Sequence, residues 1–415
     1  MTALVRRLGV ADAVVIGLGA MLGAGVFAAF APAAQAAGSG LLIGLAVAAV
    51  VAFCNATSSA RLAAVHPESG GTYVYARRRL GPFWGFQAGW SFVVGKTASC
   101  AAMALTFASY AAPGHERLVG ILAVVALTAL NYRGVQKSAL VTRVIVALTL
   151  VTLAVVVVAA LAGGTASSDR LSPFPGGDLR GILQSAGLLF FAFAGYARIA
   201  TLGEEVIEPR RTIPRAIPLA LGIVLVVYVV VGVSALLAVG AQGLAATAAP
   251  LRAVVEAGSL AALSPVVQVG AAVASLGALL ALILGVSRTT LAMARERELP
   301  PFLAAIHPRH AVPYRAELAV AAVVVVLVAT LDVRGAIGFS SFGVLTYYAL
   351  TNASALRLGP DEGRPPRPVA VLGLVGCVVL AATLPLASVL GGAAVALVGA
   401  GAWAFRRGRD RTHAG

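Results

Sequence analysis

Gly19-Ala-Met-Leu-Gly23-Ala24-Gly25-Val-Phe27 interrupts a hydrophobic segment that begins near Ala11. A second hydrophobic segment, which begins near Ile182, carries Phe190-Phe191-Ala192-Phe193-Ala194-Gly195-Tyr196 at the corresponding depth. Small residues there predict that both helices break near the middle of a membrane, where lipid cannot satisfy the freed backbone groups. Such breaks persist only against protein or a ligand, and a matched pair in two halves of a chain is typical of the binding site of secondary transporters.

The composition is that of a protein that lies almost entirely in a membrane. The chain has 415 residues, of which 60% are hydrophobic and 11% are charged, whereas a soluble domain has roughly 25% charged residues. A helix needs about 20 apolar residues to span the hydrocarbon. We therefore predict an all-α polytopic membrane protein, with a single membrane domain over residues 1–415. Twelve transmembrane helices are expected, at about 12–36, 40–63, 82–112, 117–132, 139–162, 182–207, 216–240, 265–295, 316–332, 335–357, 368–386 and 388–405.

The net charge of +15 does not indicate a nucleic-acid partner. If the N-terminus lies inside, most Lys and Arg residues fall in cytoplasmic loops or at the inner ends of spans, as the positive-inside rule requires. The outer loops would hold only Arg117, Arg170, Arg180, Arg252 and Arg334. We therefore expect a multi-pass protein of the cell (cytoplasmic) membrane, with both termini cytoplasmic and with contacts to anionic lipids.

The predicted spans fall into two units of five. Residues 11–163 hold the first five and residues 182–357 hold the next five. An odd number of spans per unit makes the second unit enter from the opposite side, which is the topology of an inverted repeat. Residues 368–405 add two last spans. The expected architecture is a 5+5 inverted repeat, helices 1–5 and 6–10, followed by helices 11 and 12.

Backbone amides at the first break suit a carboxylate. In an unwound stretch, the amides of Ala24 and Gly25 cap the start of a half-helix, whose positive dipole end favours an anion. Gly19 and Gly23 also form a small-xxx-small pair, so tight helix packing is the alternative interpretation of this segment. The presence of a second broken segment favours a ligand site.

Backbone carbonyls at the two breaks suit an ammonium group. They belong to Met21 in the first segment and to Phe191 and Ala194 in the second, where Gly195 supplies the break. An α-amino acid carries a carboxylate and an ammonium close together. The two breaks therefore predict a site for an amino acid, built mainly from backbone.

Seven groups of residues follow one another along nearly the whole chain. They are Gly19 to Phe27; Pro67-Glu-Ser-Gly-Gly-Thr-Tyr73 with Gly81 and Gly89-Trp90; Asn131-Tyr-Arg-Gly134; Phe190 to Tyr196; Glu204-Glu205-Val-Ile-Glu-Pro209 with Ile213-Pro214-Arg215-Ala216; Ser287-Arg288 with Leu299-Pro300; and Tyr347-Tyr348 with Asn352. In this order they resemble the amino acid–polyamine–organocation (APC) superfamily of permeases. The resemblance implies a leucine-transporter-like fold with alternating access, and the backbone roles given above to the two breaks.

The resemblance also implies an aromatic gate beside the second break. In that family an aromatic residue there often closes the site, and Phe191 matches it, with Phe193 and Tyr196 nearby. Ordinary core packing is the alternative role for these three side chains.

Two positions depart from the family pattern. Sodium-independent members often carry a lysine on the fifth helix, whose ammonium replaces a sodium ion, but the matching residue here is Thr149. Arginine-exchanging members carry an acid two residues after the sixth-helix glycine, where this chain has Ala197. Because no Asp or Glu lies at the predicted midplane of a span, a cationic side chain would lack a counter-charge. Arginine, lysine and polyamines are therefore disfavoured substrates.

Lys96 lies in the middle of the predicted third span, where ionisable residues are rare and mostly functional. A lysine that loses its proton when a gate closes would couple proton flow to transport. Alternatively, Lys96 supplies a fixed positive charge in place of sodium, or binds helix-end carbonyls as a structural contact. Proton coupling is the favoured role.

Charged residues after the second break predict a latch at the inner gate. Arg198 and Glu205 are seven residues apart, on one helix face, where an internal ion pair would form. A structural role for Arg198 is favoured over substrate contact. Glu204 and Glu205 complete the predicted latch, with a solvated loop as the alternative.

The sequence therefore predicts a secondary active amino acid permease for neutral or small L-amino acids, coupled to protons. Its partners would be an amino acid, protons and membrane lipids, with no cofactor and no metal. The alternatives are an exchanger or permease for another small amine or organic acid, and a non-transporting amino acid sensor. A membrane-embedded enzyme is disfavoured, because the spans show no nucleophile–base pair. Oligomeric state is left open.

Overall fold

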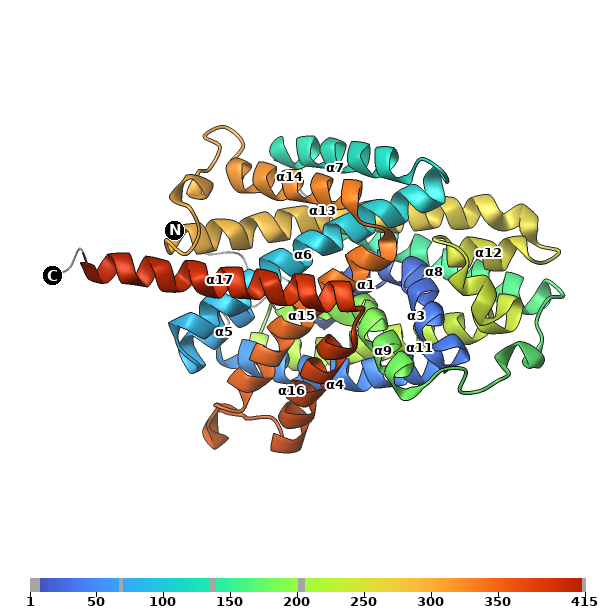
Figure 1. The fold of residues 1–415 in the computed structure, drawn as a ribbon, viewed down its shortest axis with the longest axis horizontal. Helices are drawn as coiled ribbons and strands as arrows, with labels where there is room; N and C mark the ends of the chain where they lie inside the picture. The colour runs from blue at the N-terminus through green and yellow to red at the C-terminus, as the bar shows by residue number, and fades with distance from the viewer. Residues whose placement is uncertain (1–7, 67–69, 135–138, 201–205, 413–415) are drawn as a thin grey trace.

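The computed structural model describes residues 8–66, 70–134, 139–200 and 206–412, which fold into one bundle of helices (Figure 1). Within these ranges the regular structure is helical, apart from an isolated bridge between Leu8 and Val206. The α-helices are α1 (Val10–Met21), α2 (Ala24–Ala28), α3 (Phe30–Ala37), α4 (Leu41–Val65), α5 (Thr72–Arg79), α6 (Pro82–Ala111), α7 (Glu116–Tyr132), α8 (Ala139–Ala162), α9 (Leu179–Phe193), α10 (Ala197–Ala200), α11 (Pro209–Ala245), α12 (Pro250–Glu256), α13 (Ser264–Arg295), α14 (Tyr314–Thr330), α15 (Val333–Ala355), α16 (Arg367–Thr383) and α17 (Leu386–Thr412).

Every predicted span coincides with helical structure in the described residues. In the part of the chain that the structure describes, eight helical stretches are long and apolar enough to cross a membrane. They are Val10–Ala28, Phe30–Val65, Pro82–Ala111, Leu140–Ala162, Leu179–Tyr196, Pro209–Ala245, Ala261–Arg295 and Leu386–Arg407. The chain is thus a multi-pass, all-helical membrane protein, while the number twelve and the inverted repeat stay predictions.

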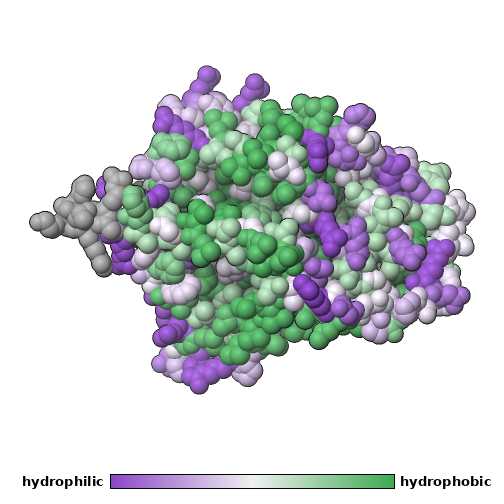
Figure 2. All heavy atoms as spheres, in the orientation of Figure 1, coloured by the Kyte–Doolittle hydropathy of each residue, from purple (hydrophilic) through white to green (hydrophobic). Residues whose placement is uncertain are grey.

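Apolar side chains cover the outside of the bundle as well as its interior. Figure 2 shows hydrophobic residues over much of the visible face, with hydrophilic residues gathered toward the two ends. Leu118, Leu122, Val144, Val226 and Leu397 are each more than half exposed. Exposing such side chains to water costs roughly 25 cal/mol per Å², and a hydrocarbon environment removes that cost.

Small residues let the central helices approach closely. α6 packs against α13 and α15. A Cβ atom on Gly95 of α6 would lie 3.1 Å from the backbone of Gly343 in α15, and Ser99 Oγ lies 2.6 Å from Ser340 Oγ. Close packing and inter-helix hydrogen bonds of this kind hold helices together in membranes. They fix α6 beside the two broken helices.

The helix α11 differs from its predicted range of 216–240. Pro214 and Pro218 lie near the start of that range, and proline removes a helical hydrogen bond and crowds the preceding turn. The structure instead begins the helix at Pro209, where a first-turn proline is favourable, and continues it through both prolines to Ala245. Gly240 has a φ of +68°, so the helix is kinked one turn before its end.

Candidate functional site

The first helix breaks where the sequence predicts it. α1 ends at Met21, and α2 begins at Ala24 after Leu22 and Gly23. Gly23 has φ −77° and ψ −140°, outside the helical range. The chain keeps helical angles at Ala29, so α2 runs directly into α3. Because the first amides of a helix have no partner within it, this break frees donors inside the bundle.

The second helix breaks at Ala194. α9 ends at Phe193, and Ala194–Tyr196 forms a 3-10 turn before α10. The carbonyl oxygen of Ala194 accepts a hydrogen bond from Lys96 Nζ at 3.3 Å and another from the Tyr348 hydroxyl at 3.3 Å. These donors come from α6 and α15. Two buried polar side chains from outside the broken helix thus bind the carbonyl that the break exposes.

The two breaks lie against each other. A Cβ atom on Gly25 would lie 2.6 Å from Cα of Ala192. A Cβ atom on Gly195 would lie 2.7 Å from the amide nitrogen of Met21 and would also collide with the carbonyl group of Ala20. The obstructing atoms belong to backbone or to Cβ, and they cannot rotate away. Tight packing of the two breaks therefore requires glycine at both positions, while a shared ligand site there stays a prediction.

Tyr228 of α11 connects the two breaks through its hydroxyl. That hydroxyl lies 2.6 Å from the carbonyl oxygen of Met21 and 3.0 Å from that of Ala192. A hydroxyl carries one proton, which Tyr228 donates to these two acceptors. The ring of Phe193 lies edge-on against the Tyr228 ring, with centroids 5.0 Å apart. One side chain thereby positions both unwound segments.

The three predicted gate residues differ in their surroundings. Phe193 and Tyr196 are fully buried, and the Tyr196 ring stacks on Tyr348 with centroids 5.0 Å apart. Phe191 keeps 8% of its surface exposed. All three side chains are therefore buried, and Phe191 is the least completely buried of them. Its gating role stays a prediction.

Lys96 is a buried cation without an acidic partner. Its side chain is 9% exposed, and among the described residues no carboxylate oxygen lies within 4.0 Å of its ammonium. An ammonium has three donors, and Lys96 directs one of them to Ala194. Thr149, at the expected lysine position, bonds its hydroxyl to the carbonyl of Ile145 at 2.8 Å. The positive charge beside the second break therefore comes from α6.

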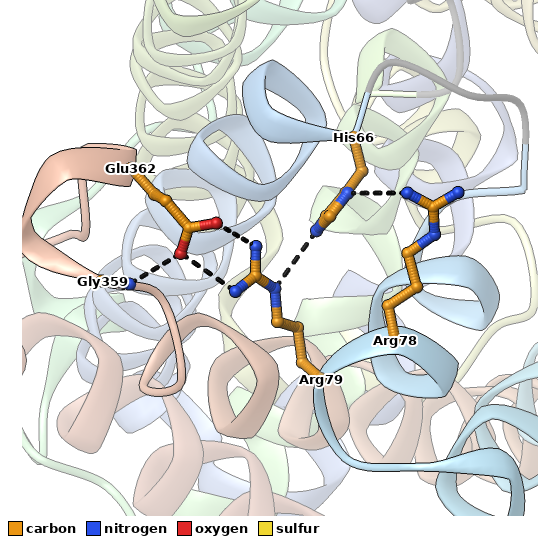
Figure 3. A network of polar contacts seen from close by, with 5 residues as sticks. All are labelled: His66, Arg78, Arg79, Gly359 and Glu362. Carbon is orange, nitrogen blue, oxygen red and sulfur yellow. Dashed lines mark hydrogen bonds and ion pairs between the residues drawn. The ribbon is translucent and has the colours of Figure 1, made fainter.

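An ion-pair network joins α5 to the loop after α15 (Figure 3). Arg79 forms a bidentate pair with Glu362, whose carboxylate also accepts from the Gly359 amide at 2.8 Å. Arg79 Nε donates to His66 Nε2 at 3.2 Å, and Arg78 Nη1 lies 3.3 Å from His66 Nδ1. The Arg79 guanidinium and the Gly359 amide hold the pKa of Glu362 at about 2.

The same short helix also binds the loop after α13. Arg77 lies 3.0 Å from Glu296 and 3.5 Å from Glu298, and the Tyr73 hydroxyl donates to Glu298 at 2.7 Å. Figure 1 shows α5 toward the end of the molecule at which α17 terminates. α5 therefore ties two loops together at this end, a role that the sequence analysis assigned to other residues.

Replacing Glu362 with glutamine is expected to lower the thermal unfolding temperature at pH 7. A carboxylate whose folded pKa lies below its ordinary value of 4.5 contributes stability above that value, and the contribution is lost as the pH falls toward 2. The difference between wild type and Glu362→Gln should therefore hold from pH 7 to pH 5 and shrink between pH 4.5 and pH 3. Glu208→Gln is the matched control, because its pair with Arg211 is exposed. A difference that is absent at pH 7, or that does not change with pH, would remove this role of Glu362.

The predicted latch is only partly within the described residues. Arg198 lies in α10 and is exposed. Glu204 and Glu205 lie outside the described residues, so their pairing with Arg198 stays a prediction.

The sequence analysis assigned no role at the site to three buried polar side chains, although it named Tyr348 within a family motif. Tyr228 and Tyr348 bind the breaks, and Tyr228 could have been noticed as the only hydroxyl in the run from Leu225 to Val231. Glu317 of α14 is fully buried, and neither carboxylate oxygen has a hydrogen-bond partner among the described residues.

A bundle of membrane-crossing helices with two broken helices in contact has the architecture of a membrane transporter. The model of the amino acid permease family matches residues 8–400. The chain therefore belongs to the amino acid permease family of the APC superfamily, a family of transporters rather than enzymes.

Similar proteins are found in bacteria. An uncharacterized transporter of Mycobacterium tuberculosis is 67% identical over 402 residues, which cover 97% of this chain and 91% of the relative. The branched-chain amino acid permease of Bacillus subtilis is 27% identical over 333 residues, covering 74% and 71%. The methylthioribose transporter of the same bacterium is 29% identical over 342 residues, covering 75% and 72%.

Proposed function

We propose that this protein is a secondary active permease for neutral or small L-amino acids, coupled to protons and working by alternating access. The observation that carries the proposal is the direct contact between two broken helices, Gly25 against Ala192 and Gly195 against Met21. Backbone donors and acceptors that lipid cannot satisfy are thereby gathered at one place inside the bundle. A substrate with both an ammonium and a carboxylate satisfies both kinds of group.

In this proposal the amides at Ala24 and Gly25 bind the carboxylate, and carbonyls at the breaks bind the ammonium. A carbonyl oxygen has two lone pairs. The Met21 carbonyl accepts from the Tyr228 hydroxyl, which leaves it room for one further donor. Phe191, which lies one residue before Ala192 at the contact between the breaks, closes the site.

The proposed membrane layout has twelve spans, with both termini cytoplasmic in the cell membrane. Its first repeat covers residues 11–163 and its second covers residues 182–357. The two broken helices, α1–α3 and α9–α10, each open one of these units, which supports their equivalence. α5 and its arginines would then lie on the cytoplasmic side, as the positive-inside rule favours.

Neutral side chains are favoured by the charges near the breaks. Lys96 lies beside the second break, and no carboxylate pairs with it among the described residues. A cationic side chain would meet a like charge there without a counter-charge. The branched-chain specificity of the Bacillus relative agrees with a neutral substrate.

The test is a thermal-shift screen of the purified protein with the common L-amino acids, at mildly acidic and at neutral pH. A ligand that binds only the folded state raises stability, by about 2.7 kcal/mol at 100 times its Kd. Neutral amino acids should stabilise the protein, and arginine and lysine should not. The shift should differ between the two pH values in wild type, and the difference should disappear in Lys96→Met but persist in Lys137→Arg. Stabilisation by none of the amino acids would refute the proposed substrate class.

A small organic substrate without an amino group is the second candidate, because one relative is a methylthioribose transporter. Such a substrate would stabilise the protein in the same assay when amino acids do not. A non-transporting sensor would bind amino acids but fail to move them across a vesicle membrane.

A further inference from the structure

The carbonyl of Ala194 is already occupied on both of its lone pairs. Lys96 Nζ donates to it at 3.3 Å, and the Tyr348 hydroxyl donates at 3.3 Å. A carbonyl oxygen accepts two hydrogen bonds in this way. An ammonium group that arrives at this carbonyl must therefore displace one of the two donors. Lys96 presents the same chemical group as the arriving substrate.

The electrostatics decide which donor is displaced. Tyr348 is neutral, whereas the Lys96 ammonium repels a second ammonium at the same acceptor. Around Lys96 are the Tyr348 hydroxyl of α15, Tyr196 stacked on that ring, and Cys100 one turn further along α6. Among the residues that the structure describes, no carboxylate oxygen lies within 4.0 Å of the Lys96 ammonium to offset a second positive charge. Two charged amines therefore cannot bind side by side.

Several helices pack against α6, and their other ionisable side chains lie on α5 or toward the ends of the remaining helices. The exception is Tyr347, which lies within α15 next to Tyr348. In the described residues these ionisable side chains are Tyr73, Tyr75, Arg77, Arg78, Arg79, Glu116, Arg117, Tyr132, Arg288, Arg295, Tyr314, Arg315, Glu317, Arg334, Tyr347, Arg406 and Arg407.

We infer that Lys96 is a tethered competitor for the amino group of the substrate, so that amine binding and a charged Lys96 at the Ala194 carbonyl exclude each other. This rests on the proposed function. On amine binding, one N–H bond of the Lys96 ammonium breaks, its proton passes to water, and the neutral amine leaves the carbonyl. The proton on Lys96 and the amino group of the substrate therefore bind in alternation and not together. The sign of this coupling is the opposite of that in a transporter whose substrate binds together with its proton.

The chain allows this to be tested at a single side chain, because Lys96 and Lys137 are its two lysines. In Lys137→Arg protein, carbon-13-labelled lysine gives one side-chain NMR signal, whose shift reports the protonation of Lys96. The signal is followed against pH, alone and with a saturating mixture of L-alanine and L-leucine. Pyruvate and 4-methyl-2-oxopentanoate, which lack the amino group, are the matched controls.

The amino acids should move the signal toward the neutral amine and shift the protonation midpoint to lower pH, and the oxo acids should not. Amino acid affinity should rise up to about tenfold per pH unit, the slope for release of one proton. Amino acid binding with an unchanged, charged Lys96 would overturn the inference and leave the proposed function standing. Failure of the mixture and of every other common amino acid to bind would overturn both.

A second variant checks the inference by affinity alone. Lys96→Met removes the competitor, so L-leucine should bind with an affinity that does not depend on pH and that at acidic pH exceeds that of wild type. Lys96→Arg keeps a cation that does not lose its proton, and L-leucine binding should fall at least tenfold at every pH. Equal affinities for wild type, Lys96→Met and Lys96→Arg would overturn the inference.

Discussion

Adding one methyl group at Gly195 is expected to abolish transport. The new Cβ atom of Gly195→Ala would lie 2.5 Å from the carbonyl carbon of Ala20 and 2.7 Å from the amide nitrogen of Met21. These atoms are backbone, so the clash is relieved only by moving the two breaks apart. Overpacking of this kind costs roughly 1–3 kcal/mol, and the backbone groups that form the site would no longer face each other. Uptake should fall by at least about tenfold, the factor that corresponds to 1.4 kcal/mol.

Gly285→Ala is the matched control for this substitution. Gly285 lies in α13, and a Cβ atom there would meet nothing within 4 Å. Uptake into proteoliposomes and thermal unfolding should match wild type in Gly285→Ala and should both drop in Gly195→Ala. Equal uptake by the two variants would show that the contact between the breaks is not needed for transport.

Removing the Tyr228 hydroxyl is expected to give the second largest effect. Tyr228→Phe keeps the ring packed on Phe193 but leaves the Met21 and Ala192 carbonyls without the donor that lies 2.6 Å and 3.0 Å from them. A buried group without its partner costs about 1–3 kcal/mol. Because the hydroxyl also holds the two breaks in register, uptake should fall by a larger factor than the loss of folding stability alone would cause.

Tyr314→Phe provides the comparison for Tyr228→Phe. Within the described ranges, the Tyr314 hydroxyl forms one hydrogen bond, which it accepts from Nε of the exposed Arg315 side chain 2.9 Å away. Its loss should change neither uptake nor stability. If Tyr228→Phe transports as well as Tyr314→Phe, Tyr228 is a packing residue and does not position the site.

The sequence predicted the helices and the breaks, because these depend on local composition. Long apolar runs identify membrane helices, and small residues identify the positions where α1 and α9 end. The structure has the break at Gly23 and the turn at Gly195 at the positions that the small residues predict. The amino acid permease family was likewise predictable, because its motifs recur in order along the chain.

The contacts that build the site were not predictable in the same way. Lys96 binds Ala194 across 98 positions of the chain, and Tyr228 binds Met21 across 207. Such pairs depend on how the helices cross. The hydropathy pattern of one sequence does not determine these crossings. Lys96 was recognised from its rarity in a span, and helix-end carbonyls were among its predicted partners, but the particular carbonyl of Ala194 was not predicted. Tyr228 was not predicted as a site residue, because a tyrosine in an apolar helix usually packs in the core.

The ends of the bundle show the same limitation. The pattern of charges placed a latch near Glu204 and Glu205. Among the described residues, Arg77 and Arg79 of α5 form ion pairs with the loops after α13 and α15. Arg79 reaches Glu362 across 283 positions. A charge run near a predicted gate indicates where arginines and acids are available, but it does not indicate which of them meet.

The most direct test of the central claim is uptake of radiolabelled L-leucine and L-alanine by the wild-type protein in proteoliposomes, with and without an imposed pH gradient. The account predicts saturable uptake above that of protein-free vesicles, accumulation that responds to the gradient, and competition by neutral L-amino acids but not by arginine. Uptake equal to that of protein-free vesicles for every common amino acid, by protein that is folded and inserted, would contradict it.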